Sequence, residues 1–190
     1  MRPLRFALYL LACLTGLPAG AAPSFQALVD GAPASGILVV PPGTYAGPAV
    51  IRRPLMVDGG GKVVIQGDGR GTVLTLAASG AVVRGLVLRG SGHSHDQMDA
   101  GLLVTGHANR IEANRIEGVL FGIVLQGAND NQVLANQVSS LGADSADRGD
   151  GLRLWNATGN LIEGNEFRQV RDLTITNSPR NRVLRNRVND

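Results

Sequence analysis

"NRIEAN", residues 109–114, is one of four segments that share the pattern N-x-[IV]-x-x-N. The other three begin at Asn131, Asn160 and Asn181, so successive starts are separated by 22, 29 and 21 residues. A fainter copy, GAVVRG, lies upstream at residues 80–85. Similarity at a period of about 20 to 50 residues indicates a repeat architecture, in which each unit buries its apolar face against its neighbours.

A second set of alternating residues lies between these motifs. It reads GLLV at 101–104, GIVL at 122–125, GLRL at 151–154 and a degenerate DLTI at 172–175. Alternation with period two predicts strands that bury one face. Short strands joined at Asn and Gly corners predict an all-β solenoid, a parallel β-helix with one coil per repeat.

Stacked coils align equivalent side chains into inward columns. We expect four such columns, which are Ile111, Val133, Ile162 and Val183; Ile116, Val138, Phe167 and Val188; Leu102, Ile123, Leu152 and Leu173; and Val104, Leu125, Leu154 and Ile175. The asparagines at 114, 136, 165 and 186 are expected to stack at a corner. Asn tolerates left-handed backbone, and stacked amides can bond to one another. We therefore interpret these asparagines as structural rather than catalytic.

The chain divides into three predicted parts. Residues 1–22 read as a cleaved secretory signal peptide, with Arg2 and Arg5, a short apolar run and a small-residue site. Residues 23–36 are expected to cap the solenoid, with Ser24 as the N-cap of a short helix. Residues 37–190 are expected to form the coils, which end inside a coil at the C-terminus.

Removing the signal peptide changes what composition implies. The whole chain has a pI near 9.7, but loss of Arg2 and Arg5 leaves 16 basic and 15 acidic side chains. That balance argues against nucleic acid as a partner. The single cysteine, Cys13, is also removed, so disulfides cannot stabilise the exported protein.

Two coils carry insertions at the same corner, over residues 91–99 and 141–149. The bare coil between them contributes Val119, Leu120 and Phe121, which we expect to form an apolar floor between two loops. Insertions on one face of a solenoid often mark its binding face. We predict a surface for a partner or ligand at this corner and the adjoining strand, made of Asp99, Leu120, Phe121, Asp147, Arg153 and Trp155.

The first insertion holds the candidate metal ligands His93, His95 and Met98. Two imidazoles and a thioether suit copper, particularly Cu(I). A hard cation held by carboxylates of both insertions is the alternative, with Asp96, Asp99, Asp144 and Asp147 as ligands. The third histidine, His107, lies on a different corner.

The chain also resembles the NosD family of accessory proteins for nitrous oxide reductase maturation. The resemblance rests on MDAGLLV (98–104), GVLFGI (118–123) and GLRLWN (151–156), with PGTYAG (42–47) and RPLMVDG (53–59) upstream. It implies a right-handed, single-stranded, pectin-lyase-like parallel β-helix in the periplasm. It also implies a non-enzymatic role in assembling the copper–sulfur centre of that reductase.

The partners implied by this resemblance are an ABC transporter, comprising an ATPase and a membrane permease, a copper chaperone and nitrous oxide reductase itself. Family members are longer, so we expect this chain to be an N-terminal part. Within the matching motif, Met98 and Asp99 are the only members of the insertion.

Two other functions remain open on the residues alone. A carbohydrate-active β-helix, such as a lyase, hydrolase or epimerase, needs converging acids and bases, for which Asp147 and Asp150 are the best candidates. A non-catalytic binding solenoid is the other, because an outward Trp155 can stack on a sugar ring or anchor a partner.

Overall fold

The computed structural model describes residues 22–34, 36–142 and 147–189, which form a short helix followed by β-strands. The predicted signal peptide, apart from Ala22, lies outside the described residues. The elements are α1 (Phe25–Asp30), β1 (Ile37–Val39), β2 (Gly43–Ala46), β3 (Ala49–Ile51), β4 (Met56–Gln66), β5 (Leu74–Leu76), β6 (Val82–Arg89), β7 (Ala100–Val104), β8 (Arg110–Glu112), β9 (Arg115–Val119), β10 (Phe121–Gln126), β11 (Gln132–Leu134), β12 (Gln137–Ser140), β13 (Leu152–Trp155), β14 (Leu161–Glu163), β15 (Glu166–Arg168), β16 (Leu173–Thr176), β17 (Arg182–Leu184) and β18 (Arg187–Asn189).

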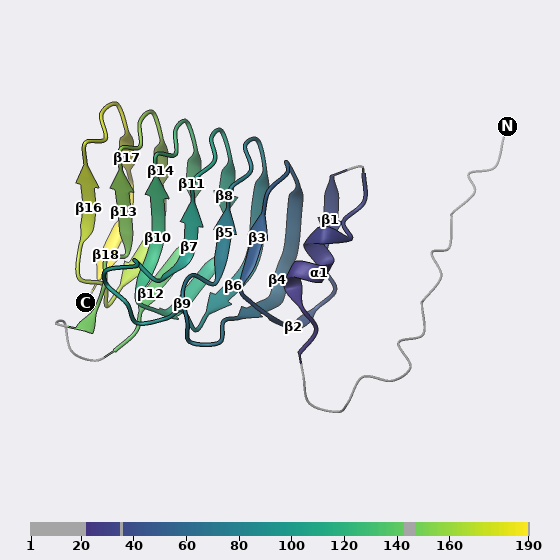
Figure 1. Ribbon diagram of the computed structural model, residues 1–190. Helices are drawn as coiled ribbons and strands as arrows, with labels where there is room; N and C mark the ends of the chain where they lie inside the picture. Colours follow the sequence, from purple (N-terminus) through teal and green to yellow (C-terminus); the bar gives the residue numbers. More distant parts are fainter. Residues whose placement is uncertain (1–21, 35, 143–146, 190) are drawn as a thin grey trace, which may run out of the picture.

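Each strand pairs in parallel with the equivalent strand of the next coil, so the chain winds into a parallel β-helix (Figure 1). The smaller sheet has the order β16-β13-β10-β7-β5-β3. The larger sheet follows β17-β14-β11-β8-β6-β9-β12-β15-β18, with β4 beside β6. Strand β6 spans both halves of this larger sheet, whereas later coils split into two short strands at the Asn corner.

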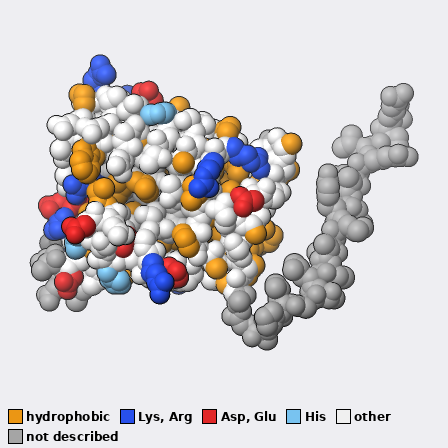
Figure 2. Space-filling view, viewed as in Figure 1, with side chains coloured by type: hydrophobic (Ala, Val, Ile, Leu, Met, Phe, Trp, Pro, Cys, Tyr) orange, Lys and Arg blue, Asp and Glu red, His pale blue; other side chains and the backbone are white. Residues whose placement is uncertain are grey.

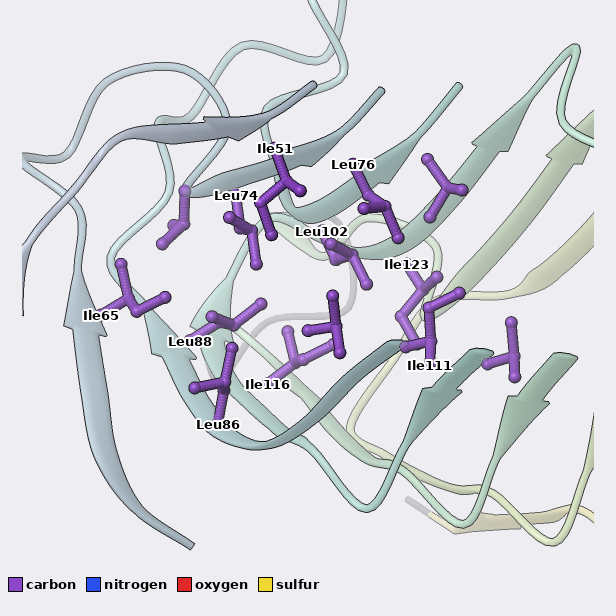
Figure 3. Close-up of a cluster of buried hydrophobic side chains, with 14 of the residues drawn as sticks. Ile51, Ile65, Leu74, Leu76, Leu86, Leu88, Leu102, Ile111, Ile116 and Ile123 are labelled. Atoms are coloured by element: carbon purple, nitrogen blue, oxygen red, sulfur yellow. The ribbon is translucent and has the colours of Figure 1, made fainter. Parts of the chain in front are cut away.

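The pairing registers confirm all four predicted columns. Val133 lies between Ile111 and Ile162, and Val138 lies between Ile116 and Phe167. The columns of the smaller sheet run through Ile123 and Leu125 of β10 with the expected partners on β7, β13 and β16. Figure 3 shows the apolar side chains of these and earlier coils meeting inside the solenoid. This continuous core provides the main hydrophobic stabilisation of the described chain.

Two asparagine ladders run along the solenoid rather than one. In the first, the side-chain amide of Asn114 donates to Asn136, that of Asn136 to Asn165 and that of Asn165 to Asn186, at 2.9–3.0 Å. The first asparagine of each motif forms a second ladder, with Asn131 bonded to Asn160 at 3.1 Å. These contacts confirm the structural interpretation of the asparagines.

The backbone reason that we expected for asparagine at these corners was wrong. The left-handed residue is the one before each asparagine, such as Ala113 (φ 52°), Ala135 (φ 51°) and Gly164 (φ 66°). The asparagine itself is needed for its amide, because the left-handed turn leaves backbone groups of adjacent coils to be paired by a side chain. Asn136, for example, accepts from the Asn114 N–H and donates to the Ile111 carbonyl.

The predicted N-terminal helix is confirmed, with Ser24 as its N-cap. Phe25 and Val29 are buried against the first coils. The Gln26 side chain accepts from the Val50 N–H at 2.6 Å and donates to the Val50 carbonyl at 3.3 Å. Since β3 pairs with a strand on one side only, this amide satisfies backbone groups on its other edge. Among the described residues, no helix is long and apolar enough to cross a membrane.

Candidate functional site

The candidate site lies at the corner where the larger sheet gives way to the smaller one. Val119 ends β9 and Phe121 begins β10, so Leu120 alone joins them. The loops that lead into β7 and β13 are longer and lie on either side of this bare connection. Both loops bond to it: the Ser91 hydroxyl accepts from the Leu120 N–H at 2.9 Å, and the Gly149 N–H donates to the Leu120 carbonyl at 3.2 Å.

The apolar floor that we expected to be open is instead covered. Leu120 and Phe121 are buried, and with Ala100 and Val124 they form an apolar cluster separate from the main core. Met98 and Leu103 pack on this cluster, and the His95 ring meets Phe121 edge to face at 5.7 Å between centroids. The prediction that Leu120 and Phe121 present a contact surface is therefore corrected, because the first loop folds down on them.

Asp99 is likewise corrected as a surface residue, since it is 4 % exposed. One of its carboxylate oxygens accepts from the Ser94 N–H at 2.9 Å, and its carbonyl accepts from the Phe121 N–H at 3.1 Å. These bonds close the turn and tie it to β10. Asp99 thus shapes the loop that carries the histidines.

The predicted metal ligands lie along this loop without forming a closed cluster. His93 and His95 are exposed, and Met98 is half-buried in left-handed backbone (φ 52°). Both His95 and Met98 contact the Phe121 cluster, so the fold brings an imidazole and a thioether to one place. Within the described residues, no three His, Cys, Asp or Glu side chains gather in a way that could hold a metal. The copper site therefore stays a prediction.

The described carboxylates proposed as ligands of a hard cation lie on two loops and differ in exposure. Asp147 is exposed at the end of the second loop, and Asp96 is exposed in the first. Asp144 lies outside the described residues. The Asp99 carboxylate bonds within its own loop. Among the described members of this set, only Asp96 and Asp147 are therefore exposed.

Trp155 lies on the outer face of β13, 37 % exposed, as the alternation predicts. The Arg153 guanidinium lies over its ring, 5.7 Å from the centroid. Arg153 also approaches the Asp150 carboxylate at 3.4 Å, and Arg171 donates to the other oxygen of Asp150 at 2.9 Å. Arg171 was not predicted, although it stands two residues before Leu173 as Asp150 stands two before Leu152, and could have been found from that register.

Figure 2 shows the outer face of the smaller sheet. Hydrophobic side chains gather over β7, β10 and β13, and charged side chains border them toward the C-terminal coils. Leu103, a half-buried outward side chain of β7 that packs on the Phe121 cluster, contributes to the apolar character of this face. The side chains of this face that can contact another molecule are those around the cluster, because the cluster itself is buried.

A comparison with known families matches residues 62–190 to the model described as the right-handed β-helix region. The chain belongs to the right-handed β-helix family. That match supplies the handedness, and it covers the coils that carry both loops and Trp155.

Two curated relatives make the family more specific. The chain is 32 % identical over 136 residues to a "Probable ABC transporter binding protein NosD" of Stutzerimonas stutzeri, and 35 % identical over 133 residues to the protein of the same name from Pseudomonas aeruginosa. The alignments cover 70 % and 68 % of this chain and 31 % of each relative. The NosD resemblance is confirmed, and the chain spans about a third of the length of these relatives.

Solved structures show the same fold at much lower identity. The catalytic domain of a GH87 α-1,3-glucanase in complex with nigerose gives a TM-score of 0.59 at 12 % identity, covering 74 % of this chain and 27 % of that one. A variant of such a domain in complex with tetrasaccharides gives 0.62 at 14 %, covering 91 % and 38 %. These likenesses concern the β-helix architecture alone.

Proposed function

We propose that this protein is a periplasmic accessory protein that acts with an ABC transporter in assembling the copper–sulfur centre of nitrous oxide reductase. The transporter would comprise an ATPase and a membrane permease, and a copper chaperone would supply the metal. The observation that carries the proposal is the similarity to two NosD proteins over most of this chain. Copper is cargo in this proposal, not a resident cofactor.

We also propose that the solenoid catalyses no reaction. The outward positions of β7, β10, β13 and β16 hold Leu103, Val124, Arg153 and Thr174, which offer no general acid or base pair. Asp150, a buried carboxylate two residues before β13, is engaged by two guanidinium groups. An ion-paired carboxylate of this kind is poorly suited to proton transfer.

The loop of residues 91–99 supports a docking role. Its base is fixed by Ser91, Asp99 and the Phe121 cluster, while His93 and His95 remain exposed. A preorganised loop loses little conformational freedom on binding. We therefore assign the exposed side of this loop, with Asp147 on the facing loop, to contact with the transporter.

Binding to the transporter is the direct test. The purified protein is titrated against the permease and ATPase, reconstituted in lipid nanodiscs, with biolayer interferometry as the readout. We expect saturable binding that His93→Ala/His95→Ala weakens and that His107→Ala, a change at a different corner, leaves unchanged. Equal binding of both variants would remove the loop from the interface, and no binding by the wild type would reject the proposed function.

Copper binding by the loop of residues 91–99 is tested by anaerobic Cu(I) competition with a colorimetric chelator. His93→Ala/His95→Ala and Met98→Ala are compared with His107→Ala as the matched control. We expect stoichiometric binding that only the first two lose, since imidazole and thioether donors suit Cu(I). If the folded wild-type protein leaves the chelator fully loaded, the loop carries no copper.

A further inference from the structure

We propose that the free edge of strand β1 pairs with the same strand of a second copy of this chain, across a two-fold axis. The pairing joins two solenoids through their first coils, because β1 lies at the end of the stack opposite to β16 (Figure 1). This inference is independent of the accessory role, since it uses none of the residues assigned above to contact with the transporter.

The first coil has three strands, and two of them have a covered edge. The Gln26 side chain bonds to the backbone of Val50 in β3. The Ala46 N–H of β2 donates to the Pro23 carbonyl at 2.8 Å, and Ser24 forms a parallel bridge with Ala46. Strand β1 pairs with β4, and no other described strand pairs with it. The segment that caps the solenoid therefore leaves one edge of the first coil open.

The open edge of β1 presents the backbone groups of two residues. The Val40 N–H donates to the Asp58 carbonyl of β4 at 2.9 Å. Successive residues of a strand direct their N–H and C=O groups to opposite edges, so Ile37 and Val39 direct theirs away from β4. These groups are available to an added strand.

The side chains at this edge favour pairing. Ile37 is 51 % exposed and Val39 is 71 % exposed. Exposed edge strands are commonly protected by charged side chains, which hinder the approach of another strand. The chain has no charged residue between Asp30 and Arg52, so no like charges meet when two copies of this edge come together.

An antiparallel pair centred on Leu38 satisfies both copies of the edge. Each Ile37 then lies opposite Val39 of the other copy, and the two residues exchange both of their backbone hydrogen bonds. Leu38, which packs on the main core, lies opposite Leu38 of the other copy. Apolar side chains thus meet apolar side chains on both faces of the joined sheet. The same strand provides both halves of the interface, as two-fold symmetry requires.

The last described coil of another copy is a poorer partner for β1. Parallel stacking in the register of the solenoid places Ile37 beside Arg182 of β17, because the two residues share one column. That contact brings an apolar side chain against a guanidinium group, and it repeats from copy to copy without closing. The two-fold pair closes. It is a weak pair, because three residues per strand bury less than the roughly 1,200 Å² of a stable interface.

Sedimentation velocity of the protein, from low micromolar to millimolar concentration, tests the pairing. We expect a reversible equilibrium between monomer and dimer. Val39→Lys brings two like charges to the paired strands and should weaken dimerisation by about tenfold or more. Val188→Lys, at an exposed valine of β18, should dimerise as wild type. A monomer at every concentration, species larger than a dimer, dimerisation of Val39→Lys equal to that of wild type, or its loss in Val188→Lys would reject the proposal.

Cysteine cross-linking tests the register, in a Cys13→Ser background that leaves no other thiol. In the two-fold pair, the Cα atoms of the two Leu38 residues are about 4.5 Å apart, within the range of a disulfide. Those of the two Val39 residues are about 8 Å apart, beyond that range. We expect Leu38→Cys to form an intermolecular disulfide several times faster than Val39→Cys, with circular dichroism to verify that both variants fold. Equal or faster cross-linking of Val39→Cys would overturn the inference.

Discussion

At the scale of single residues, Asn136 shows why the repeat motif retains asparagine. Its carbonyl oxygen accepts from both the backbone and the side-chain N–H groups of Asn114, and its amide donates to the Ile111 carbonyl and to Asn165. The side chain is fully buried. Asp has no amide N–H to donate, and Ala would remove the acceptor of both Asn114 N–H groups and the donor to the Ile111 carbonyl inside the core.

Asn136→Ala should therefore lower the free energy of unfolding by about 3 kcal/mol, since several buried polar groups lose their partners together. Chemical denaturation followed by circular dichroism measures this loss. Gln132→Ala removes an exposed amide four residues earlier and should change stability by less than about 0.5 kcal/mol. Equal effects of the two substitutions would show that the ladder adds nothing beyond ordinary side-chain contacts.

Asp58 gives a prediction for pH. The Gly60 N–H and then the Arg84 guanidinium, which donate to its two oxygens at 2.9 and 2.7 Å, hold the pKa of this carboxyl below its usual value of 3.8. A lowered folded-state pKa contributes stability that is complete above the unfolded-state value and is lost as pH falls through the folded-state value.

The melting temperature of Asp58→Asn should thus lie below that of wild type at pH 7, and the difference should shrink below about pH 4. Thermal melts from pH 7 to pH 2 follow it. Arg84→Gln keeps the Gly60 bond and should show a smaller dependence on pH than wild type. If the difference in melting temperature between wild type and Asp58→Asn stays constant from pH 7 to pH 2, ionised Asp58 does not stabilise the folded state.

At the scale of elements, side chains near the β9–β10 corner are buried in two different ways, some in the main core and some in a small cluster outside it. The strands place Ile123 and Leu125 inward by alternation, while Phe121 and Val124 are buried in a separate outer cluster against which Met98, in the loop of residues 91–99, packs. The loop is attached through Ser91 and Asp99 to a coil other than its own. Its stability is accordingly local and depends on the small cluster beneath it.

Phe121→Ala should release this loop while leaving the solenoid folded. Amide hydrogen exchange of residues 91–99 should rise strongly, with a modest loss of global stability, because the side chain lies outside the main core. Phe167→Ala, in an inward column, should instead cost about 4 kcal/mol globally. If Phe121→Ala accelerates exchange across all coils equally, the outer cluster is part of the main core.

The sequence was sufficient to predict the repeated part of this structure and insufficient for the part that occurs once. Val133 and Leu154 could be placed because four coils repeat their environment, and stacking then dictates register. The covering of Leu120 and Phe121 could not, since alternation says which way a side chain points and not what a nearby loop does. Arg171 is a different case, because the register that pairs Leu152 with Leu173 also places it opposite Asp150, one coil away, and was available from the repeat.

At the scale of the whole molecule, each described coil contacts its neighbours in the stack, and stability accumulates along the axis. In such a solenoid, the contribution of a core side chain depends on whether coils cover it from both sides. The column of Ile116, Val138, Phe167 and Val188 offers an internal comparison, because Val138 is 2 % exposed and Val188 is 57 % exposed. The two valines share one strand position in the coil and differ in their neighbours along the axis.

Val138→Ala should lower the free energy of unfolding by about 2 kcal/mol, because it leaves a cavity between covered coils. Val188→Ala removes the same atoms from the same column and should cost less than about 0.5 kcal/mol, because that side chain is already in contact with water. Denaturant titration of both variants, with hydrogen exchange to locate the change, compares them directly. Similar losses would mean that Val188 is covered in solution by another surface, and the exchange protection of β18 would then rise with protein concentration if that surface belonged to a second copy.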